Sequence, residues 1–254
     1  MRKMIVGMVG FLAMGMIGLA DSGLGVSAEV PVVSSFTSRG RTFQDNVVYQ
    51  PNITVTKQVG ETTLLINGWE NLNSDRKHGN IFDETDLTLG GITPVNKDIS
   101  VNYGLINYIY SDMLIYAPVV VEDTREVYFG VTTTYLGINP NATVYYDVEQ
   151  ANGGYLVLDV NHCFVCGDKS SLIADISIGM ADSSYNAFYF GVDKAKLNDW
   201  STGLTYGYSV NKKATISTGI RYSYIIDNEI RDGAESSYDS VNIVIGKISF
   251  SYNF

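Results

Sequence analysis

The 254-residue chain has little positive charge, few titratable side chains near neutral pH and almost no cysteine. Its 17 basic residues stand against 27 acidic ones, and it has two histidines and two cysteines. The formal charge of −10 argues against a nucleic-acid partner, because nucleic-acid binding needs a basic surface. Beyond residue 20, no apolar run approaches the roughly 20 residues of a membrane-spanning helix. Any membrane crossing after that point must use another kind of structure.

The sequence also lacks the usual signatures of a catalytic or cofactor site. No phosphate-binding glycine motif appears, and we predict neither a cofactor nor a metal ion. His78 falls in a predicted long loop. His162 falls near a strand end, on the apolar face, where no Ser-His-acid arrangement can be assembled around it. We therefore expect that the protein is not an enzyme.

The two cysteines form a C-x-x-C motif, Cys163 to Cys166, at the end of a predicted strand. A redox motif of this kind normally begins a helix, whose dipole lowers the thiol pKa. A zinc site needs two further ligands, and His162 is the one histidine nearby. Two interpretations remain open, namely a short-range disulfide formed in an oxidising compartment and a pair of free thiols.

The N-terminus has the pattern of an export signal. Arg2 and Lys3 precede an apolar run over residues 4–20, and small residues then lead to Ala28. A retained membrane helix is the alternative, but small residues follow the run where a positive flank would be expected. We predict that residues 1–28 are a cleaved signal peptide. The chain that is left has 15 basic and 26 acidic residues, a formal charge of −11.

The last fifteen residues, SVNIVIGKISFSYNF, alternate between apolar and polar side chains. One side of this predicted strand carries Val244, Gly246, Ile248, Phe250, Tyr252 and Phe254, and the other carries Lys247, Ser249, Ser251 and Asn253. Such a period of two, ending in aromatics, is typical of a strand with one face in lipid and one in water. Tyr252 and Phe254 resemble the terminal signal of bacterial outer-membrane barrels, with a serine where glycine is usual. We expect the barrel assembly machinery to recognise them.

The same alternation recurs along the chain. We count twelve segments, at 32–43, 47–57, 61–72, 82–93, 97–110, 125–137, 142–149, 154–165, 170–180, 200–210, 213–226 and 240–254. Short gaps follow every second segment, and several of the other gaps are long, such as 73–80, 111–124, 181–199 and 227–239. A β-sandwich has no reason to show this sidedness. We predict an all-β fold over residues 29–254, a closed antiparallel transmembrane barrel of about twelve strands, with short periplasmic turns and longer outer loops. Ten or fourteen strands are the alternatives.

Five short pieces of sequence carry a family resemblance. They are Ser38-Arg39-Gly40, Val48-Tyr49-Gln50-Pro51, Glu126-Val127-Tyr128, Val144-Tyr145-Tyr146-Asp147 and the stretch Ala174–Tyr185. Together they resemble the Gcw_chp or TorF-like family of putative outer-membrane porins. The resemblance implies a small outer-membrane barrel without a defined substrate and without catalytic residues.

The alternation also predicts which charges line the lumen. The inward faces carry Arg39, Glu84, Asp86, Glu126, Asp147, Glu149, Asp159, Asp175, Arg221 and Lys247. One interpretation is an interior that is merely wetted or packed with side chains. A second is a weakly cation-preferring pore, because rings of carboxylates favour cations. A third is that the basic residues pair with facing acids and brace the barrel, which would remove the selectivity.

These observations predict an outer-membrane porin of a Gram-negative bacterium, through which small hydrophilic solutes diffuse passively. Its partners would be outer-membrane lipid, the assembly machinery and those solutes, and the sequence leaves the oligomeric state undetermined. The alternative is a non-conducting barrel with a structural or adhesive role in its outer loops. The loop at 181–199 would either enter the lumen as a constriction or stay on the surface.

Overall fold

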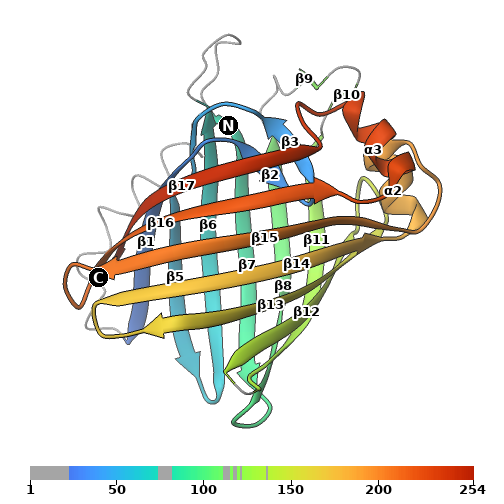
Figure 1. Cartoon of the computed structure of the whole chain (residues 1–254). Helices are drawn as coiled ribbons and strands as arrows, with labels where there is room; N and C mark the ends of the chain where they lie inside the picture. The colour runs from blue at the N-terminus through green and yellow to red at the C-terminus, as the bar shows by residue number, and fades with distance from the viewer. Residues whose placement is uncertain (1–22, 74–81, 111–114, 117–118, 121, 136) are drawn as a thin grey trace.

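The computed structural model describes residues 23–73, 82–110, 115–116, 119–120, 122–135 and 137–254. Its twelve long strands are β1 (Leu24–Val33), β5 (Asn52–Val59), β6 (Thr62–Asn73), β7 (Phe82–Pro94), β8 (Ile99–Tyr110), β11 (Thr124–Thr133), β12 (Ile138–Asp147), β13 (Gly154–Cys166), β14 (Ser170–Ala181), β15 (Lys196–Ser209), β16 (Ala214–Ile225) and β17 (Asn242–Asn253). Each pairs antiparallel with its neighbours in chain order (Figure 1). The short strand β4 (Val48–Tyr49) precedes β5 and pairs with β1 and β6 at the same seam.

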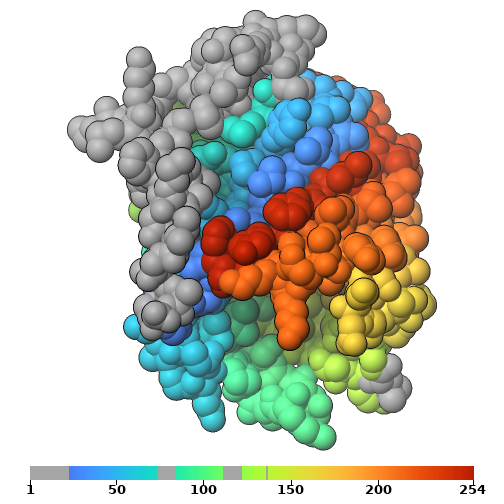
Figure 2. All heavy atoms as spheres, turned by 90° about the vertical axis from the view of Figure 1, so that its left-hand side faces the viewer, coloured from blue at the N-terminus to red at the C-terminus, as the bar shows by residue number. Residues whose placement is uncertain are grey.

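The first and last strands close the sheet into a barrel. Ala28 in β1 lies opposite Tyr252 in β17, and the paired stretch runs from Ser27 to Val33. Figure 2 shows the two strands side by side on the surface, the blue segment next to the red one. The predicted closed antiparallel barrel of twelve strands is confirmed. Closure leaves no unpaired sheet edge, which a chain in lipid requires.

Apolar side chains cover the outside of the barrel, as the alternation predicts. On β15 and β16, Leu204 and Ile220 are 43% and 56% exposed, and Ile248 on β17 is 62% exposed. The residues between them, such as Thr205 and Gly219, lie opposite one another on the inward face. Because large apolar side chains rarely cover a whole surface in water, this outer layer fits acyl chains.

The two ends of the barrel differ in their connections. Tight turns join the strands at 60–61, 95–98, 134–137, 167–169 and 210–213, and all lie at one end. The start of β1 and the end of β17 lie there too, since Leu24 pairs with Lys57 and the Asn253 N–H donates to the Lys213 carbonyl. The predicted long loops at 73–80 and 111–124 fall largely outside the described residues.

The other end, called here the long-loop end, carries two short helices that the alternation did not predict. They are α2 (Ser183–Phe190) and α3 (Asn228–Glu235), at the upper right of Figure 1. Two further short strands, β9 (Ile115–Tyr116) and β10 (Val119–Val120), pair with each other nearby. Within the described residues, no helix has the length and apolar character needed to cross a bilayer.

The predicted first strand at 32–43 is wrong. The first barrel strand, β1, ends at Val33, and a hairpin of β2 (Phe36–Ser38) and β3 (Arg41–Gln44) follows. The hairpin turn has a positive φ at both Arg39 (50°) and Gly40 (75°), the left-handed conformation that breaks a strand. A hairpin alternates like a strand on either side of its turn, which explains the error.

The pairing of β1 bears on the predicted signal-peptide boundary after Ala28. Residues 1–22 lie outside the described part of the chain, so cleavage remains a prediction. Leu24 to Ala28, however, pair with Lys57 to Ile53 on β5, and Ala28 also pairs with β17. The barrel therefore begins before residue 29, and cleavage after Ala28 would remove half of β1.

A shortened chain tests where the barrel begins. A chain that starts at Glu29 loses the β1 hydrogen bonds of residues 24–28, each worth about 1 kcal/mol. We expect its free energy of unfolding in lipid vesicles to fall by several kcal/mol relative to a chain that starts at Gly23. The measurement is urea unfolding of both chains after refolding. Equal stabilities would place the start of the barrel after Ala28.

Candidate functional site: the barrel lumen

The hairpin of β2 and β3 lies inside the barrel, at its long-loop end. Thr42, Phe43 and Gln44 are all buried, although the hairpin belongs to no wall. Phe36 stacks on Phe43 with ring centroids 5.0 Å apart and contacts Trp69, which points inward from β6, at 5.7 Å. Aromatic packing of this kind adds to the stabilisation from burial alone. The hairpin is thus a packed internal element that narrows the lumen.

Arg39 at the tip of this hairpin is held by three side chains of the barrel wall, and a fourth wall side chain supports one of them. Its Nη1 and Nη2 donate to the two carboxylate oxygens of Glu126 at 2.6 and 2.7 Å. The guanidinium also lies over the rings of Tyr145 and Tyr155, 4.6 and 4.7 Å from their centroids. The Tyr108 hydroxyl donates to Glu126 at 2.8 Å. We call Glu126, Tyr108, Tyr145 and Tyr155 the guanidinium cage.

Arg41, on the second strand of the hairpin, was not among the predicted lumen residues. Its guanidinium lies 4.1 Å from the ring centroid of Tyr189 and 5.1 Å from that of Phe43. The alternation alone would place Arg41 on the same face as Arg39, two residues earlier, so its inward position needed no further signal. The spacing R-G-R at the turn is the signal that could have identified both arginines as one unit.

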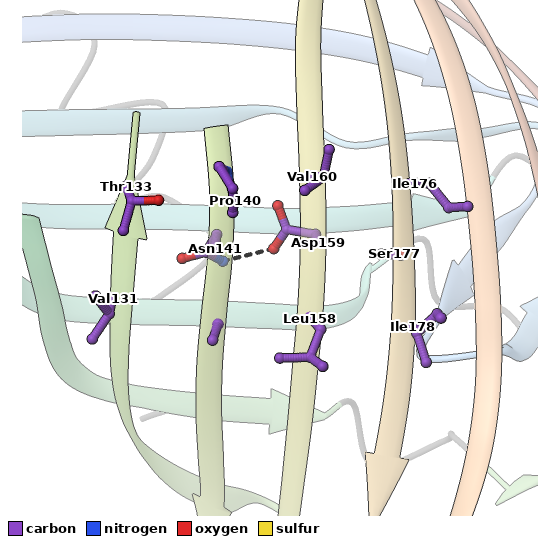
Figure 3. A pocket seen from close by; sticks show the side chains of 11 residues that line it. Val131, Thr133, Pro140, Asn141, Leu158, Asp159, Val160, Ile176, Ser177 and Ile178 are labelled. Atoms are coloured by element: carbon purple, nitrogen blue, oxygen red, sulfur yellow. Dashed lines mark hydrogen bonds between the residues drawn. The ribbon is translucent and has the colours of Figure 1, made fainter. Parts of the chain in front are cut away.

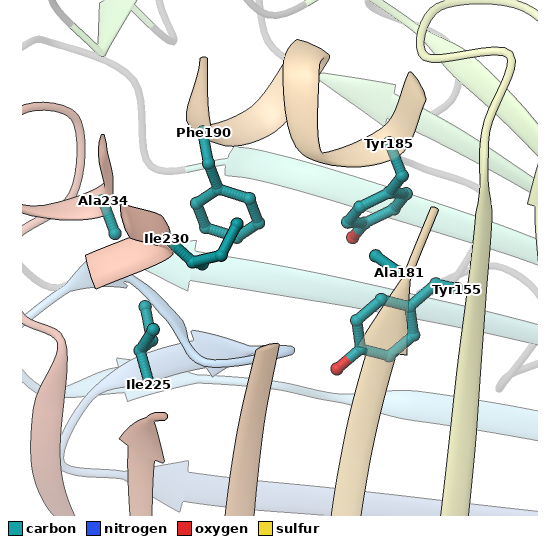
Figure 4. Close-up of a cluster of buried hydrophobic side chains, with 7 residues drawn as sticks. All are labelled: Tyr155, Ala181, Tyr185, Phe190, Ile225, Ile230 and Ala234. Atoms are coloured by element: carbon teal, nitrogen blue, oxygen red, sulfur yellow. The ribbon is translucent and has the colours of Figure 1, made fainter. Parts of the chain in front are cut away.

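The two helices close the long-loop end above the hairpin. Side chains from both helices and from the wall form one buried cluster, drawn in Figure 4: Tyr155, Ala181, Tyr185, Phe190, Ile225, Ile230 and Ala234. Each helix has a capped start, since Asp182 accepts from the Tyr185 N–H and Asp227 accepts from the Glu229 and Ile230 N–H groups. The loop at 181–199 was expected either to constrict the lumen or to stay on the surface. Its helix α2 packs into this cluster, so the segment forms a constriction.

Ion pairs link the segment after α2 to α3. Lys194 Nζ lies 2.8 Å from Glu229 Oε2, and Lys196 Nζ lies 3.0 Å from Asp227 Oδ2. The hydrogen bonds from Lys194 and Lys196 lower the pKa of Glu229 below its ordinary value. A lowered carboxyl pKa means that these pairs stabilise the fold at neutral pH and lose that effect only as the pH falls through the lowered value. Exposed pairs of this kind contribute little each.

The other predicted basic residues of the lumen are also paired. Arg221 Nη2 lies 2.6 Å from Asp175 Oδ2, and its Nη1 donates to Ser201 at 2.6 Å. Lys247 Nζ lies 2.8 Å from Glu29 Oε1 across the β1–β17 seam. Glu29 was missed because the predicted signal-peptide boundary placed it at the extreme start of the mature chain. These pairs match the third interpretation of the lumenal charges.

The remaining predicted acids divide into several environments. Asp147 is buried and accepts the Thr124 hydroxyl at 2.9 Å, and Asp159 accepts Asn141 Nδ2 at 2.6 Å. Glu84 is buried on the inward face of β7. Asp86, on the same face, has one oxygen without a hydrogen-bond partner among the described residues. All four lie on the inward faces that the alternation predicts.

Glu149 does not lie where it was predicted. It is exposed and forms an ion pair at 2.8 Å with Arg125, whose side chain is 53% exposed. Strand β12 ends at Asp147, so the alternation that placed Glu149 inward does not extend to it. Arg125 itself lies on the outward face, next to the exposed Val127. The pair therefore belongs to the outer rim.

Two neighbouring cavities, which share three lining residues, lie beside the hairpin. One of about 270 Å³ is lined by Thr37, Thr205, Gly219, Arg221 and Lys247, among others. The other, of about 250 Å³, is lined by Arg39, Tyr155, Asp199, Ser201 and Arg221, among others. Small side chains on β15 and β16 leave this space, because glycine, serine and threonine do not reach the barrel axis. The lumen is thus narrowed at the long-loop end and hollow below it.

A larger hollow lies on the outside and has a different character. A groove of about 430 Å³ crosses β11 to β14, as Figure 3 shows. Leu158, Ile176 and Ile178 line it and are among the exposed apolar residues of the outer face. The small Ala142 leaves the recess between them. Its apolar lining fits an acyl chain and argues against a site for a hydrophilic solute.

The structure also places the cysteines and the chain terminus. Cys163 and Cys166 form a disulfide with Cα atoms 6.0 Å apart, the first of the two alternatives. In the described part of the chain, no three His, Cys, Asp or Glu side chains gather as a metal site. Tyr252 and Phe254 pack edge to face at 5.0 Å at the end of β17. Their role as an assembly signal stays a prediction.

The fold defines a closed barrel of the kind found in outer-membrane porins. The chain aligns over 90% of its length with all of the NanC porin (TM-score 0.52, 11% identity) and over 91% with 99% of the KdgM porin (TM-score 0.51, 6% identity). It aligns over 90% with all of LpxR from Salmonella typhimurium (TM-score 0.51, 8% identity). At these identities the likeness shows the fold alone.

The particular family follows from a family model that matches residues 18–242. The chain belongs to the Gcw_chp family, described as bacterial protein of unknown function. The predicted family is therefore confirmed under that name, whereas the TorF-like name does not appear in the match. A comparison with curated proteins gives no match.

Removing one acid tests how firmly the hairpin is anchored. Glu126→Gln leaves Arg39, whose side chain is only 14% exposed, without its counter-charge; breaking a buried pair in this way typically costs about 3 to 5 kcal/mol. The matched control is Glu149→Gln, which breaks the exposed pair with Arg125 and should cost less than about 1 kcal/mol. The measurement is urea unfolding of both variants in lipid vesicles. A small cost for both would mean that the hairpin is not anchored through Glu126.

Proposed function

We propose that the protein is an outer-membrane barrel that conducts small hydrophilic solutes through a narrow lumen. The observation that carries this proposal is the contrast between the two faces of the wall. The outside is apolar at Leu204, Ile220 and Ile248, while hydroxyl, glycine and charged residues line two neighbouring cavities inside. Such a wall isolates a wet interior from lipid.

The hairpin and the helices set the width of the proposed path. Twelve strands enclose less space than the sixteen of large general porins, and the hairpin fills part of that space. The guanidinium cage and the cluster around Tyr185 and Phe190 then leave the narrowest part at the long-loop end. Solutes would have to be small, or the hairpin would have to move.

The lumenal ion pairs make any charge preference small. Glu126, Asp175 and Glu29 each neutralise a basic residue at 2.6 to 2.8 Å. The weak cation preference predicted from the acidic excess thus rests on Asp86, Asp147 and Asp159, which have no basic partner in the contacts described above. We keep it as a prediction of a slight bias.

A second candidate function is a non-conducting barrel with a structural or adhesive role. The pairing of Arg39, Arg221 and Lys247 with acids favours it, because these contacts fill and brace the interior. The helices α2 and α3 would then form part of the exposed surface that carries this structural or adhesive role.

Location and assembly complete the proposal. The tight-turn end would face the periplasm and the long-loop end the outside of a Gram-negative cell. Lipid would cover the apolar outer face, and the assembly machinery would recognise Tyr252 and Phe254. The Cys163–Cys166 disulfide at a tight turn fits an oxidising compartment such as the periplasm.

Single-channel recording distinguishes the two candidate functions. In planar bilayers, the refolded protein should give small discrete conductance steps. Replacing residues 35–44 by a short Gly-Ser linker should enlarge those steps, because it removes the internal hairpin. The matched control is a Gly-Ser replacement of the same kind in the exposed tight turn at 167–169. If neither the wild type nor the shortened variant conducts, the non-conducting role is favoured.

Charge variants test the balance of the lumen. Asp175→Asn leaves Arg221 without its acid and should shift the reversal potential in a salt gradient toward anions. Arg221→Gln leaves Asp175 unpaired and should shift it toward cations. Identical reversal potentials in both variants would show that this pair does not line the conducting path.

A further inference from the structure

The guanidinium cage has the chemistry of a ligand-binding site, and the ligand is part of the same chain. Two parallel hydrogen bonds to Glu126 and two flanking rings, Tyr145 and Tyr155, surround one planar cation. This combination suits a guanidinium group, which donates in a fork and stacks on aromatic faces. An ammonium group can do neither in the same way.

The parts of this contact come from different kinds of structure. The cage residues stand on β8, β11, β12 and β13, which are consecutive strands of the closed wall. Arg39 instead comes from the hairpin tip, where its φ of 50° is unusual for a residue other than glycine. The binding groups are thus fixed in the wall, whereas the Arg39 guanidinium is attached to the hairpin.

Space for the rest of a solute adjoins the cage. The cavity of about 250 Å³ is lined by Arg39 and Tyr155 and continues to Asp199 and Ser201. It shares Thr37, Arg221 and Ile245 with the cavity of about 270 Å³ below. A solute with a guanidinium head in the cage would therefore place its body in this polar space.

We propose that the cage of Glu126, Tyr108, Tyr145 and Tyr155 is a binding site for solutes that carry a guanidinium group, and that Arg39 occupies it as a built-in competitor. A solute that displaces Arg39 frees the hairpin tip from the wall. The link to transport rests on the proposed channel function, whereas the binding itself does not.

Calorimetric titration with ethylguanidinium tests the site directly. Arg39→Ala, refolded in detergent micelles, should bind ethylguanidinium saturably. The wild type should bind it at least about tenfold more weakly, because the tethered Arg39 competes at high effective concentration. Adding Glu126→Gln to Arg39→Ala should weaken the binding of ethylguanidinium by about tenfold or more. Ethylamine should bind Arg39→Ala about tenfold more weakly than ethylguanidinium does, because an ammonium group cannot donate in a fork.

The matched control is Arg221→Ala, which exposes Asp175 in the same lumen. The contacts described above for Arg221 are with Asp175 and Ser201 and do not include the two tyrosine rings that flank Arg39. This variant should therefore show no saturable binding of ethylguanidinium. Refolding of Arg39→Ala is judged by its gel mobility before and after heating. If it does not refold, Arg39→Met, which places an apolar side chain at that position, serves instead.

Three results would overturn the proposal. They are a folded Arg39 variant that does not bind ethylguanidinium, binding that survives Glu126→Gln unchanged, and equal binding of ethylamine. In planar bilayers, ethylguanidinium should also block the Arg39→Ala channel at the concentrations found by calorimetry. A barrel that binds the ligand but shows no conductance would refute the channel and leave the site standing.

Discussion

Backbone hydrogen bonding in a solvent that offers none is the constraint on which the rest of this structure depends. Lipid tails cannot satisfy an N–H or C=O group, so each strand must pair on both sides and the sheet must close. Pairing of β1 with β17 meets that demand. Closure gives every strand one face toward lipid and one toward the interior, and the period-two alternation of the sequence is the consequence.

The interior then has to be filled or wetted, and this chain does both. At the long-loop end, the hairpin, α2 and α3 bring Phe43, Tyr185 and Phe190 into a packed plug. Toward the tight-turn end, small side chains leave polar cavities. The charge on Arg39 is satisfied by a carboxylate and by aromatic faces together. Stability and the width of the lumen thus depend on the same contacts.

The alternation was enough to predict the barrel, its strand number and the inward position of eight of the ten proposed lumen charges, because a wall strand obeys a local rule. Arg39 also lies inside, but on the hairpin and not on a wall strand. Glu149 departed from that rule because β12 had already ended at Asp147. The hairpin could not be distinguished from a strand by periodicity, since its inward position depends on contacts with Glu126 and Trp69 that lie far away in sequence. Both helices have readable signals, Asp182 and Asp227 as N-caps, but they lie between strands, where the period-two pattern predicts only loops.

The claim that lipid lies against the apolar face and water lies inside can be measured at two adjacent residues. In a chain with Trp69 and Trp200 replaced by Phe, a single tryptophan is placed at Leu204 or at Thr205 on β15, and the barrel is refolded into vesicles of lipid with brominated acyl chains. The structure predicts strong fluorescence quenching for Leu204→Trp and little for Thr205→Trp. Equal quenching at both positions, or stronger quenching at Thr205, would contradict it.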